Sequence, residues 1–372
     1  MKIAYVYDAI YPYTIGGVEK RIATLSERLV ARGHEIHIIG LKSWENEPYF
    51  FRKGIHYHGV GSPKVFYTSS RRSVSEALYF GYNVISPLIQ DRYDIIDCQN
   101  FPYFSCFSSA FASRIRGSRL VVTWHEVWLD YWYDYLGVKG SFGRVIEKCT
   151  AKLSDNLVAV SESTRSDLNR LNPHASIELI PNGIDFQQID AVKPAAYSSD
   201  IIFTGRLIRE KKADLLIDAL VLIKKEIPGI RCVVIGDGPE KEGLFRLCKK
   251  YHLENNLLFT GFVQNHNEVL ALMKASKIFI SPSVREGFGM AALEALACGL
   301  PVVTGNSPKN AVKELVTHKT GIISDLSPDS FAEAFLTCLK NKNSMTEECK
   351  TQSMSYDWKK IVSDVEGYYS RV

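Results

Sequence analysis

The chain has 372 residues, of which 46% are hydrophobic and 23% are charged. This composition excludes a disordered or fibrous protein, and the length predicts two domains rather than one. There are 45 Lys and Arg residues against 41 Asp and Glu residues. The resulting net charge of +4 gives no general argument for nucleic acid as a partner.

Strands and helices are expected to alternate in the first part of the chain. The apolar run 3–7 predicts a buried strand, 18–32 has the pattern of an amphipathic helix, and 36–39 predicts the next strand. Further strands are expected at 95–98, 120–123, 156–160 and 177–179. This alternation predicts a parallel sheet flanked by helices, which we assign to a first domain over residues 1–190.

A second domain of the same kind is expected over residues 191–355. Residues 180–199 are rich in Pro, Asn, Gly and Ser and predict an interdomain hinge. Strands are then expected at 200–204, 231–235, 256–260, 278–281 and 301–304. Because ligands bind α/β sheets at the carboxyl ends of the strands, a cleft between two such domains is the expected active site.

The sequence indicates the compartment only indirectly. The eight cysteines are scattered, without the close pairs of zinc or redox motifs, which favours a reduced, cytosolic environment. The first residues turn polar too early for a secretion signal, and no run reaches the roughly 18 apolar residues of a membrane span. We expect a cytoplasmic protein whose membrane contact, if any, is peripheral and at the inner face.

The strongest motif lies at residues 281–294. A strand is followed by the loop Gly287, Phe288 and Gly289 and by a helix from Met290, which leaves backbone N–H groups free for a phosphate. Glu286 and Glu294 flank this anion site and suit sugar hydroxyls, one on a donor sugar and one on a ribose. Taken singly, either glutamate is better explained as a surface residue.

Glu286 and Glu294 match an E-x7-E signature, and the chain here resembles glycosyltransferase family four. Further stretches recur in that family's order and spacing over nearly the whole chain, namely 205–207, 210–211, 236–240 and 261–262. The resemblance implies the GT-B fold, an α/β architecture of two Rossmann-like domains facing a central cleft. The first domain would bind the acceptor and the second the nucleotide sugar, with 356–372 as a C-terminal helix crossing back to the first.

The same resemblance implies the reaction, which is retaining transfer of a hexose or related sugar from a UDP- or GDP-sugar to a glycan or lipid-linked acceptor. Arg206 and Lys211 follow a strand end, and by resemblance they neutralise the leaving diphosphate. The adjacent Arg209 and Lys212 leave the choice of lysine open on the residues alone. His125 follows the strand 120–123, and the resemblance gives it a positioning contact with the donor sugar, although a lone histidine is more often structural.

Gly16 and Gly17 follow the first strand and precede a helix, where glycine lets a ligand approach the backbone. An ordinary turn explains them equally well in isolation, and the resemblance places them at the donor pyrophosphate. The expected catalytic residues are Arg206, Lys211, Glu286 and His125. The other expected donor-binding residues are Gly205, Gly236, Gly238, Phe262, Val263, Gly287, Phe288, Gly289, Met290 and Glu294.

A dinucleotide cofactor is disfavoured, because Lys241 stands where the third glycine of a G-x-G-x-x-G fingerprint beginning at Gly236 would be needed. There is no D-x-D motif, and no carboxylate and histidine cluster has metal-ligand spacing. We therefore expect catalysis without a metal ion or cofactor, with positive side chains in place of the ion.

Two aromatic clusters suggest the nature of the acceptor. Between Glu47 and Glu76 there is no acidic residue, and basic residues alternate with aromatic ones, which suits an anionic membrane surface. A solvated loop beside the acceptor site explains this segment as well. The second cluster either lines the acceptor site or packs in the core, and comprises Trp124, Trp128, Tyr131, Trp132, Tyr133 and Tyr135. Our hypothesis is a lipid-linked or otherwise membrane-associated acceptor.

Two alternatives stay open at this point. A sugar-nucleotide epimerase of similar fold would convert the donor without an acceptor, and a catalytically silent protein would bind the nucleotide sugar without transfer. The sequence leaves open the base, the donor sugar, the acceptor, the linkage and the oligomeric state.

Overall fold

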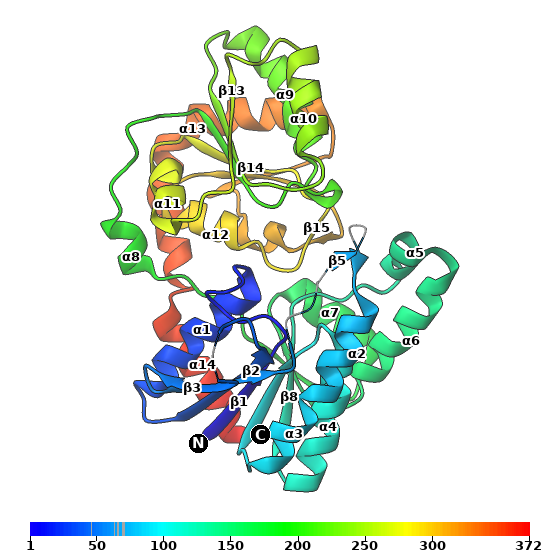
Figure 1. Cartoon of the computed structure of the whole chain (residues 1–372). Coiled ribbons are helices and arrows are strands. Elements are labelled where there is room, and N and C mark those ends of the chain that lie inside the picture. The colour runs from blue at the N-terminus through cyan, green and yellow to red at the C-terminus, as the bar shows by residue number, and fades with distance from the viewer. Residues whose placement is uncertain (46, 63, 65–66, 69–70) are drawn as a thin grey trace. The chain divides into compact units, whose positions relative to one another are not determined.

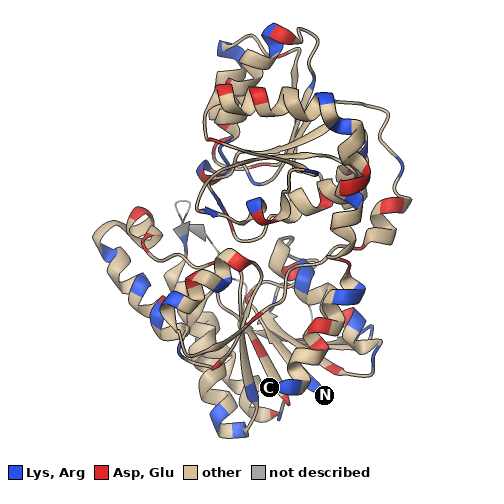
Figure 2. Cartoon of the chain, turned by 180° about the vertical axis from the view of Figure 1, so that it is seen from behind, with Lys and Arg blue, Asp and Glu red and all other residues tan. Residues whose placement is uncertain are grey.

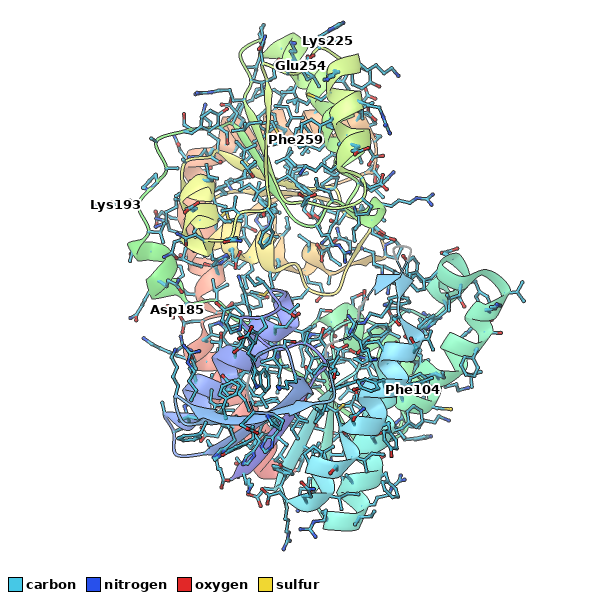
Figure 3. All side chains as sticks on the ribbon, in the orientation of Figure 1. Phe104, Asp185, Lys193, Lys225, Glu254 and Phe259 are labelled. Carbon is cyan, nitrogen blue, oxygen red and sulfur yellow. The ribbon has the colours of Figure 1, made fainter. Side chains whose placement is uncertain are left out.

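The computed structural model describes residues 1–372 except 46, 63, 65–66 and 69–70. The chain divides into two compact units, each a largely parallel sheet with helices packed on it (Figure 1). The first unit comprises Met1–Asn182 and Trp358–Val372, and the second comprises Gly183–Asp357. Side chains fill the space between sheet and helices in each unit (Figure 3).

The sheet of the first unit has the strand order β10-β9-β8-β7-β1-β2-β4-β3. Its strands are β1 (Lys2–Val6), β2 (Glu35–Leu41), β3 (Tyr49–Arg52), β4 (Ile55–Val60), β7 (Ile95–Gln99), β8 (Arg119–Trp124), β9 (Asn156–Ala159) and β10 (Ser176–Leu179). The pairings are parallel apart from β3, which runs antiparallel to β4 at the sheet edge. Strands β3 and β4 were not predicted from the sequence pattern.

Each face of this sheet packs into its own hydrophobic core, because successive side chains on a strand point to opposite faces. Ile3 and Tyr5 of β1 enter one core, whereas Ala4 and Val6 enter the other. The helices of this unit are α1 (Gly17–Val30), α2 (Val74–Asn83), α3 (Ile85–Gln90), α4 (Tyr103–Arg116), α5 (Tyr131–Leu136), α6 (Gly140–Thr150), α7 (Glu162–Leu171) and α14 (Trp358–Arg371). A 3-10 turn (Gly137–Lys139) joins α5 to α6, and a short hairpin pairs β5 (Tyr67–Thr68) with β6 (Arg71–Arg72).

Helix α14 belongs to the first unit although it lies at the far end of the sequence. Its apolar face, from Trp358 to Tyr369, is buried in the same core as Ile3 and Tyr5. Polar contacts reinforce this packing, since Glu366 accepts a hydrogen bond from Arg32 at 2.6 Å and lies 2.8 Å from the His34 ring. Helix α14 therefore covers one face of the sheet whose strand β1 begins at Lys2.

The sheet of the second unit has the order β13-β12-β11-β14-β16-β18, and its neighbouring strands pair in parallel. The strands are β11 (Ile201–Thr204), β12 (Cys232–Ile235), β13 (Leu257–Gly261), β14 (Ile278–Ser281), β16 (Val302–Gly305) and β18 (Gly321–Ser324), with the short pair β15 (Arg285–Glu286) and β17 (Lys309–Asn310) outside the sheet. The helices are α8 (Phe186–Ala191), α9 (Ala213–Glu226), α10 (Lys241–Lys250), α11 (His266–Lys274), α12 (Met290–Ala297) and α13 (Pro328–Met354), with 3-10 turns at Arg209–Lys211 and Ala311–Leu315.

The segment expected to be an irregular hinge, 180–199, contains helix α8. Asp185, labelled in Figure 3, caps this helix by accepting a hydrogen bond from the Gln188 backbone at 2.9 Å. The backbone N–H of Ile184 bonds to Tyr356 at 2.9 Å. Helix α8 belongs to the second unit, whose boundaries are 182/183 and 357/358, where the sequence pattern predicted 190/191 and 355/356.

In the part of the chain that the structure describes, no helix is both long and apolar enough to cross a membrane.

Candidate active site

The expected donor-binding residues of the second unit come to one edge of its sheet. Gly205 and Arg206 directly follow β11, Gly236 follows β12, and the loop to Glu286 follows β14. Since these neighbouring strands are parallel, their carboxyl ends lie at the same edge, where α/β proteins bind ligands.

Lys211 and Glu286 form an ion pair at this edge. Lys211 ends the 3-10 turn Arg209–Lys211, and that turn is joined to the loop after β14 because the Val284 N–H donates to the Glu210 carbonyl at 2.9 Å. Both charged side chains are about one fifth exposed, at 19% and 20%. A cation and a carboxylate, far apart in sequence, thus lie side by side and still within reach of a ligand.

A helix start lies next to this pair. Gly289 precedes α12 in the left-handed region, with φ of 97°, and no side chain caps the helix. The first N–H groups of α12 are suited to an anion. Phe288 is 7% exposed and packs edge-on against Tyr356, with ring centroids 5.9 Å apart, so its side chain is a core residue rather than a donor contact. Gly287 and Met290, on either side of this turn, are half-buried.

Glu294 of α12 pairs with His266, the first residue of α11, at 2.9 Å. The Glu294 side chain is 12% exposed, so most of its surface is already covered. His266 was not among the site residues predicted from the sequence. A polar residue at the start of the helix after β13 was the available signal, because helix starts after parallel strands lie at the ligand edge.

Gly205, Gly236 and Gly238, in the loops after β11 and β12, have structural roles in the backbone. The Gly205 N–H donates to Ile235 at 3.0 Å and the Gly236 N–H donates to Gly261 at 2.9 Å, so consecutive strand ends are tied together. A Cβ atom at Gly236 would collide with the Gly205 carbonyl oxygen, and one at Gly238 would collide with the Leu207 backbone. A structural reason therefore accounts for both glycines, in addition to any donor contact.

Three other expected residues lie near these loops. Phe262 is 57% exposed directly after β13, whereas Val263 is half-buried. Arg206 is exposed and follows β11, so its guanidinium can reach a ligand at the sheet edge.

In the first unit, His125 follows β8 and is held through both its backbone and its ring. The backbone N–H donates to the Asn100 side-chain oxygen at 3.1 Å, and ring atom Nε2 lies 2.8 Å from Gln99 Oε1. Burial, with a smaller contribution from the nearby charge of Arg21, lowers the pKa of His125 to about 3. The ring is therefore neutral at physiological pH.

Gly16 and Gly17 lie where α1 begins, Gly16 as the residue before the helix and Gly17 as its first residue. A Cβ atom at Gly16 would collide with the carboxylate of Glu19, which folds back over the helix start. Glu19 is 7% exposed, and burial raises its pKa. An acidic side chain thus already occupies part of this positive helix end, which any bound phosphate would have to share.

A buried ion cluster that the sequence analysis did not anticipate lies at the carboxyl end of β1. Asp8 is fully buried and pairs with Arg72, whose side chain lies 3.6 Å from Glu76. Burial raises the pKa of Glu76, and the neighbouring Arg72 opposes that shift. The Arg72 N–H also donates to the Tyr135 hydroxyl at 2.6 Å, which ties β6 to α5.

The two aromatic clusters expected from the sequence differ in how far their side chains are buried. Trp124 and Trp132 are buried core residues, and Trp128 packs on Trp132 with ring centroids 4.6 Å apart. Most of that cluster is therefore core. In the segment 47–76, Phe51 is 59% exposed on the edge strand β3. Phe66, and the side chains of Tyr67 and Arg71, lie outside the described residues.

One group of side chains has the composition of a metal site, although no sequence spacing suggested it. Single donor atoms of Glu35, His37 and His56 lie within 4.8 Å of one another. The two imidazole rings are stacked, however, at 4.4 Å and 9° between planes, so their in-plane lone pairs do not converge on a common point. The cluster also lies at the start of β2, at the opposite edge of the sheet from His125. It does not enter the chemistry considered below.

Two family models match the chain in succession. Residues 15–188 match Glycosyltransferase Family 4, and residues 187–354 match Glycosyl transferases group 1. A phosphatidylinositol N-acetylglucosaminyltransferase subunit of Arabidopsis thaliana is 26% identical over 100% of this chain and 82% of its own length. The GDP-mannose-dependent alpha-(1-6)-phosphatidylinositol dimannoside mannosyltransferase of Mycobacterium tuberculosis is 24% identical over 98% of this chain and 95% of its own length.

The fold has a solved counterpart in sucrose-phosphate synthase from Thermosynechococcus elongatus. The TM-score is 0.84 at 18% identity, covering 100% of this chain and 98% of the other. Fold and family together define a glycosyltransferase of the GT-B class, as the sequence predicted. The chain belongs to glycosyltransferase family four.

Proposed function

We propose that this glycosyltransferase moves a hexose or related sugar from a UDP- or GDP-sugar to a glycan or lipid-linked acceptor with retention of configuration, and that it needs no metal ion. The observation that carries the proposal is the juxtaposition of Lys211 and Glu286 beside the open start of α12. A sugar diphosphate presents hydroxyl groups and an anionic phosphate on either side of the bond that breaks. A carboxylate and an ammonium group side by side match these two halves.

Each residue then has a defined task. Glu286 accepts hydrogen bonds from hydroxyls of the donor sugar, while Lys211 and Arg206 meet the negative charge that develops on the departing phosphate. Preplaced cations lower the barrier because they need no rearrangement as the charge develops. The N–H groups at the start of α12 hold the pyrophosphate, and Glu294, steadied by His266, binds the ribose. Gly16, Gly17 and His125 are assigned donor contacts as well, as the family resemblance implies.

A donor panel tests this proposal. Thermal unfolding of the protein is measured with UDP-, GDP- and ADP-sugars, and the donor that raises the midpoint is then offered in a transfer assay. Binding stabilises the folded state by RT ln(1 + [L]/Kd), so a ligand at 100 times its Kd adds about 2.7 kcal/mol. Conversion of the donor without any acceptor would instead identify an epimerase. Binding without transfer or hydrolysis would identify a silent binding protein.

A lipid-linked acceptor is supported by two independent observations. Both relatives described above carry phosphatidylinositol in their names. In addition, the turn before α6 and α6 itself expose Val138 at 90%, Phe142 at 66% and Val145 at 59%. The same segment exposes the basic residues Lys139, Arg144 and Lys148. Lys and Arg residues recur along the outer helices of this unit (Figure 2). Exposed apolar residues among cations suit the surface of an anionic bilayer.

Co-sedimentation with vesicles tests the membrane contact. The full chain is expected to bind vesicles that contain an anionic phospholipid and not vesicles of neutral phosphatidylcholine. Phe142→Ser should weaken this binding, whereas Phe111→Ser should not, although Phe111 on α4 is also 52% exposed. Equal binding to both kinds of vesicle, or equal effects of the two variants, would remove the support for a peripheral membrane contact.

A further inference from the structure

A continuous chain of hydrogen bonds leads from the C-terminal helix to His125. The Tyr369 hydroxyl of α14 donates to Asp97 Oδ2 at 2.5 Å. The Gln99 side-chain nitrogen donates to Asp97 Oδ1 at 2.9 Å, and Gln99 Oε1 lies 2.8 Å from His125 Nε2. Asp97, Gln99 and Tyr369 are between 2% and 4% exposed, so water does not compete for these contacts.

The arrangement follows from the sheet. Asp97 and Gln99 are two residues apart on β7, so their side chains lie on the same face. On the adjacent strand β8, Thr123 is the register partner of Gln99, and its hydroxyl donates to Asp97 at 2.8 Å. Every hydrogen bond described at Asp97 is one that its carboxylate accepts.

The direction of each hydrogen bond in the chain is fixed by the carboxylate. A carboxylate can only accept, so the amide nitrogen of Gln99 must face Asp97. The amide oxygen of Gln99 must then face His125, and because a carbonyl oxygen also only accepts, His125 Nε2 must carry the proton. A neutral imidazole protonated at Nε2 has a bare lone pair on Nδ1. Within the described residues, Nδ1 of His125 has no hydrogen-bond partner.

We propose that Asp97 and Gln99 are positioning residues that hold His125 in the Nε2-protonated form, so that Nδ1 accepts a hydrogen bond from a hydroxyl group of the donor sugar. This inference rests on the proposed function, in which His125 contacts the donor. It refines that function, because it makes His125 a hydrogen-bond acceptor that recognises one hydroxyl group of the donor sugar instead of a general acid or base. The lowered pKa of His125 agrees with this role, since a protonated ring could not accept.

Nuclear magnetic resonance of the full chain labelled with ¹⁵N-histidine tests the tautomer directly. The His125 signal is assigned by its loss in His125→Asn, and the spectrum at pH 7 without donor is expected to show a protonated, hydrogen-bonded Nε2 and a bare Nδ1. Gln99→Met keeps the side-chain length but removes both amide groups, and it should abolish the hydrogen-bond signature at Nε2. Asp97→Asn can face Gln99 with either end of its amide, and it should populate both tautomers.

One further variant separates positioning from general damage. Thr123→Val removes another hydrogen bond to Asp97 without touching Gln99, and should leave the His125 spectrum as in the wild type even if stability falls. A proton on Nδ1 in the wild-type protein, or a wild-type spectrum in both Gln99→Met and Asp97→Asn, would overturn the proposal.

Kinetics provide the link to the donor sugar. With the donor found in the panel above, Gln99→Met is expected to raise KM about five- to tenfold, which corresponds to one neutral hydrogen bond, without changing the affinity for the free nucleoside diphosphate. The spectra need no turnover, so failure of the proposed function would leave them unchanged. If the enzyme is active but Gln99→Met changes neither KM nor the His125 spectrum, the positioning role of Gln99 is refuted while the proposed function stands.

Discussion

Two neighbouring tyrosines on α14 allow the contribution of a buried, hydrogen-bonded hydroxyl group to be measured. The Tyr369 hydroxyl donates to Asp97, whereas the Tyr368 hydroxyl is buried and has no hydrogen-bond partner among the residues that the structure describes. Tyr369→Phe and Tyr368→Phe each remove one oxygen atom from the same helix. Their effects on stability should therefore differ by the hydrogen bonds of Tyr369, which are the short one to Asp97 and a longer one, at 3.3 Å, to the Tyr5 hydroxyl.

The expected magnitude follows from the nature of the acceptor. Hydrogen bonds to charged groups contribute about 1.5–3 kcal/mol, so Tyr369→Phe should lower the free energy of unfolding by that amount. Tyr368→Phe should leave it unchanged or raise it slightly, because the wild-type hydroxyl is desolvated without compensation. For units of about 150–250 residues, each kcal/mol shifts the thermal midpoint by about 2–4 °C, which predicts a fall of about 3–12 °C for Tyr369→Phe.

Urea and thermal unfolding of the full chain, followed by circular dichroism, measure both quantities. Equal losses of stability in the two variants would refute the reasoning, because they would show that the surroundings of the rings, and not the bond to Asp97, determine the effect.

Three further predictions concern the site, the pH dependence and the backbone. Arg206→Ala and Lys211→Ala should each lower kcat about 100- to 1000-fold with an unchanged circular dichroism spectrum. The control Lys212→Ala, which loses only an ion pair with Asp214, should keep a kcat near that of the wild type. Near-normal turnover in Arg206→Ala or Lys211→Ala would disprove the leaving-group role. Burial and the neighbouring His37 and His56 lower the folded-state pKa of His58 to about 4 from its usual 6.5, so its contribution to stability is complete above about pH 6.5 and is lost as the pH falls through 4. His58→Gln should flatten the unfolding free energy between pH 4 and 7 by at most about 3 kcal/mol, and an unchanged slope would contradict the assignment. Gly289→Ala should cost about 1–2 kcal/mol in chemical unfolding, because φ is positive there and because the added Cβ would collide with the Val312 side chain, while Gly229→Ala, where a Cβ meets nothing within 4 Å, should not.

The strands were predictable where burial on both faces makes a continuous apolar run. Residues 278–281 form a strand with the expected bounds, since all of its side chains are buried. Strand β4 carries His56, Tyr57 and His58 and exposes part of both faces, so its sequence lacks that signal. Helix α8 was missed because Pro and Gly precede it and because its start is held by the distant residue Asp357, whose side chain accepts from the Phe186 N–H at 3.3 Å.

In the candidate site, too, local sequence features were predictable and contacts between distant residues were not. Glu286 and Glu294 were found because their spacing and the glycines between them are local features. The partner of Glu294, His266, is the first residue of another helix, α11, and the pair depends on the order of strands in the sheet. The hydrogen bonds of Asp97 join β7, β8 and α14, and no local pattern encodes an interaction between residues 97 and 369.

The sequence position of α14 affects how the protein is made. The ribosome synthesises Met1–Asn182, then all of Gly183–Asp357, and only afterwards the helix that covers Ile3, Tyr5 and Val121. Throughout that interval the nascent chain carries an uncovered apolar face and an Asp97 carboxylate without its tyrosine. The core formed by Met1–Asn182 is therefore complete only after Trp358–Arg371 has been synthesised.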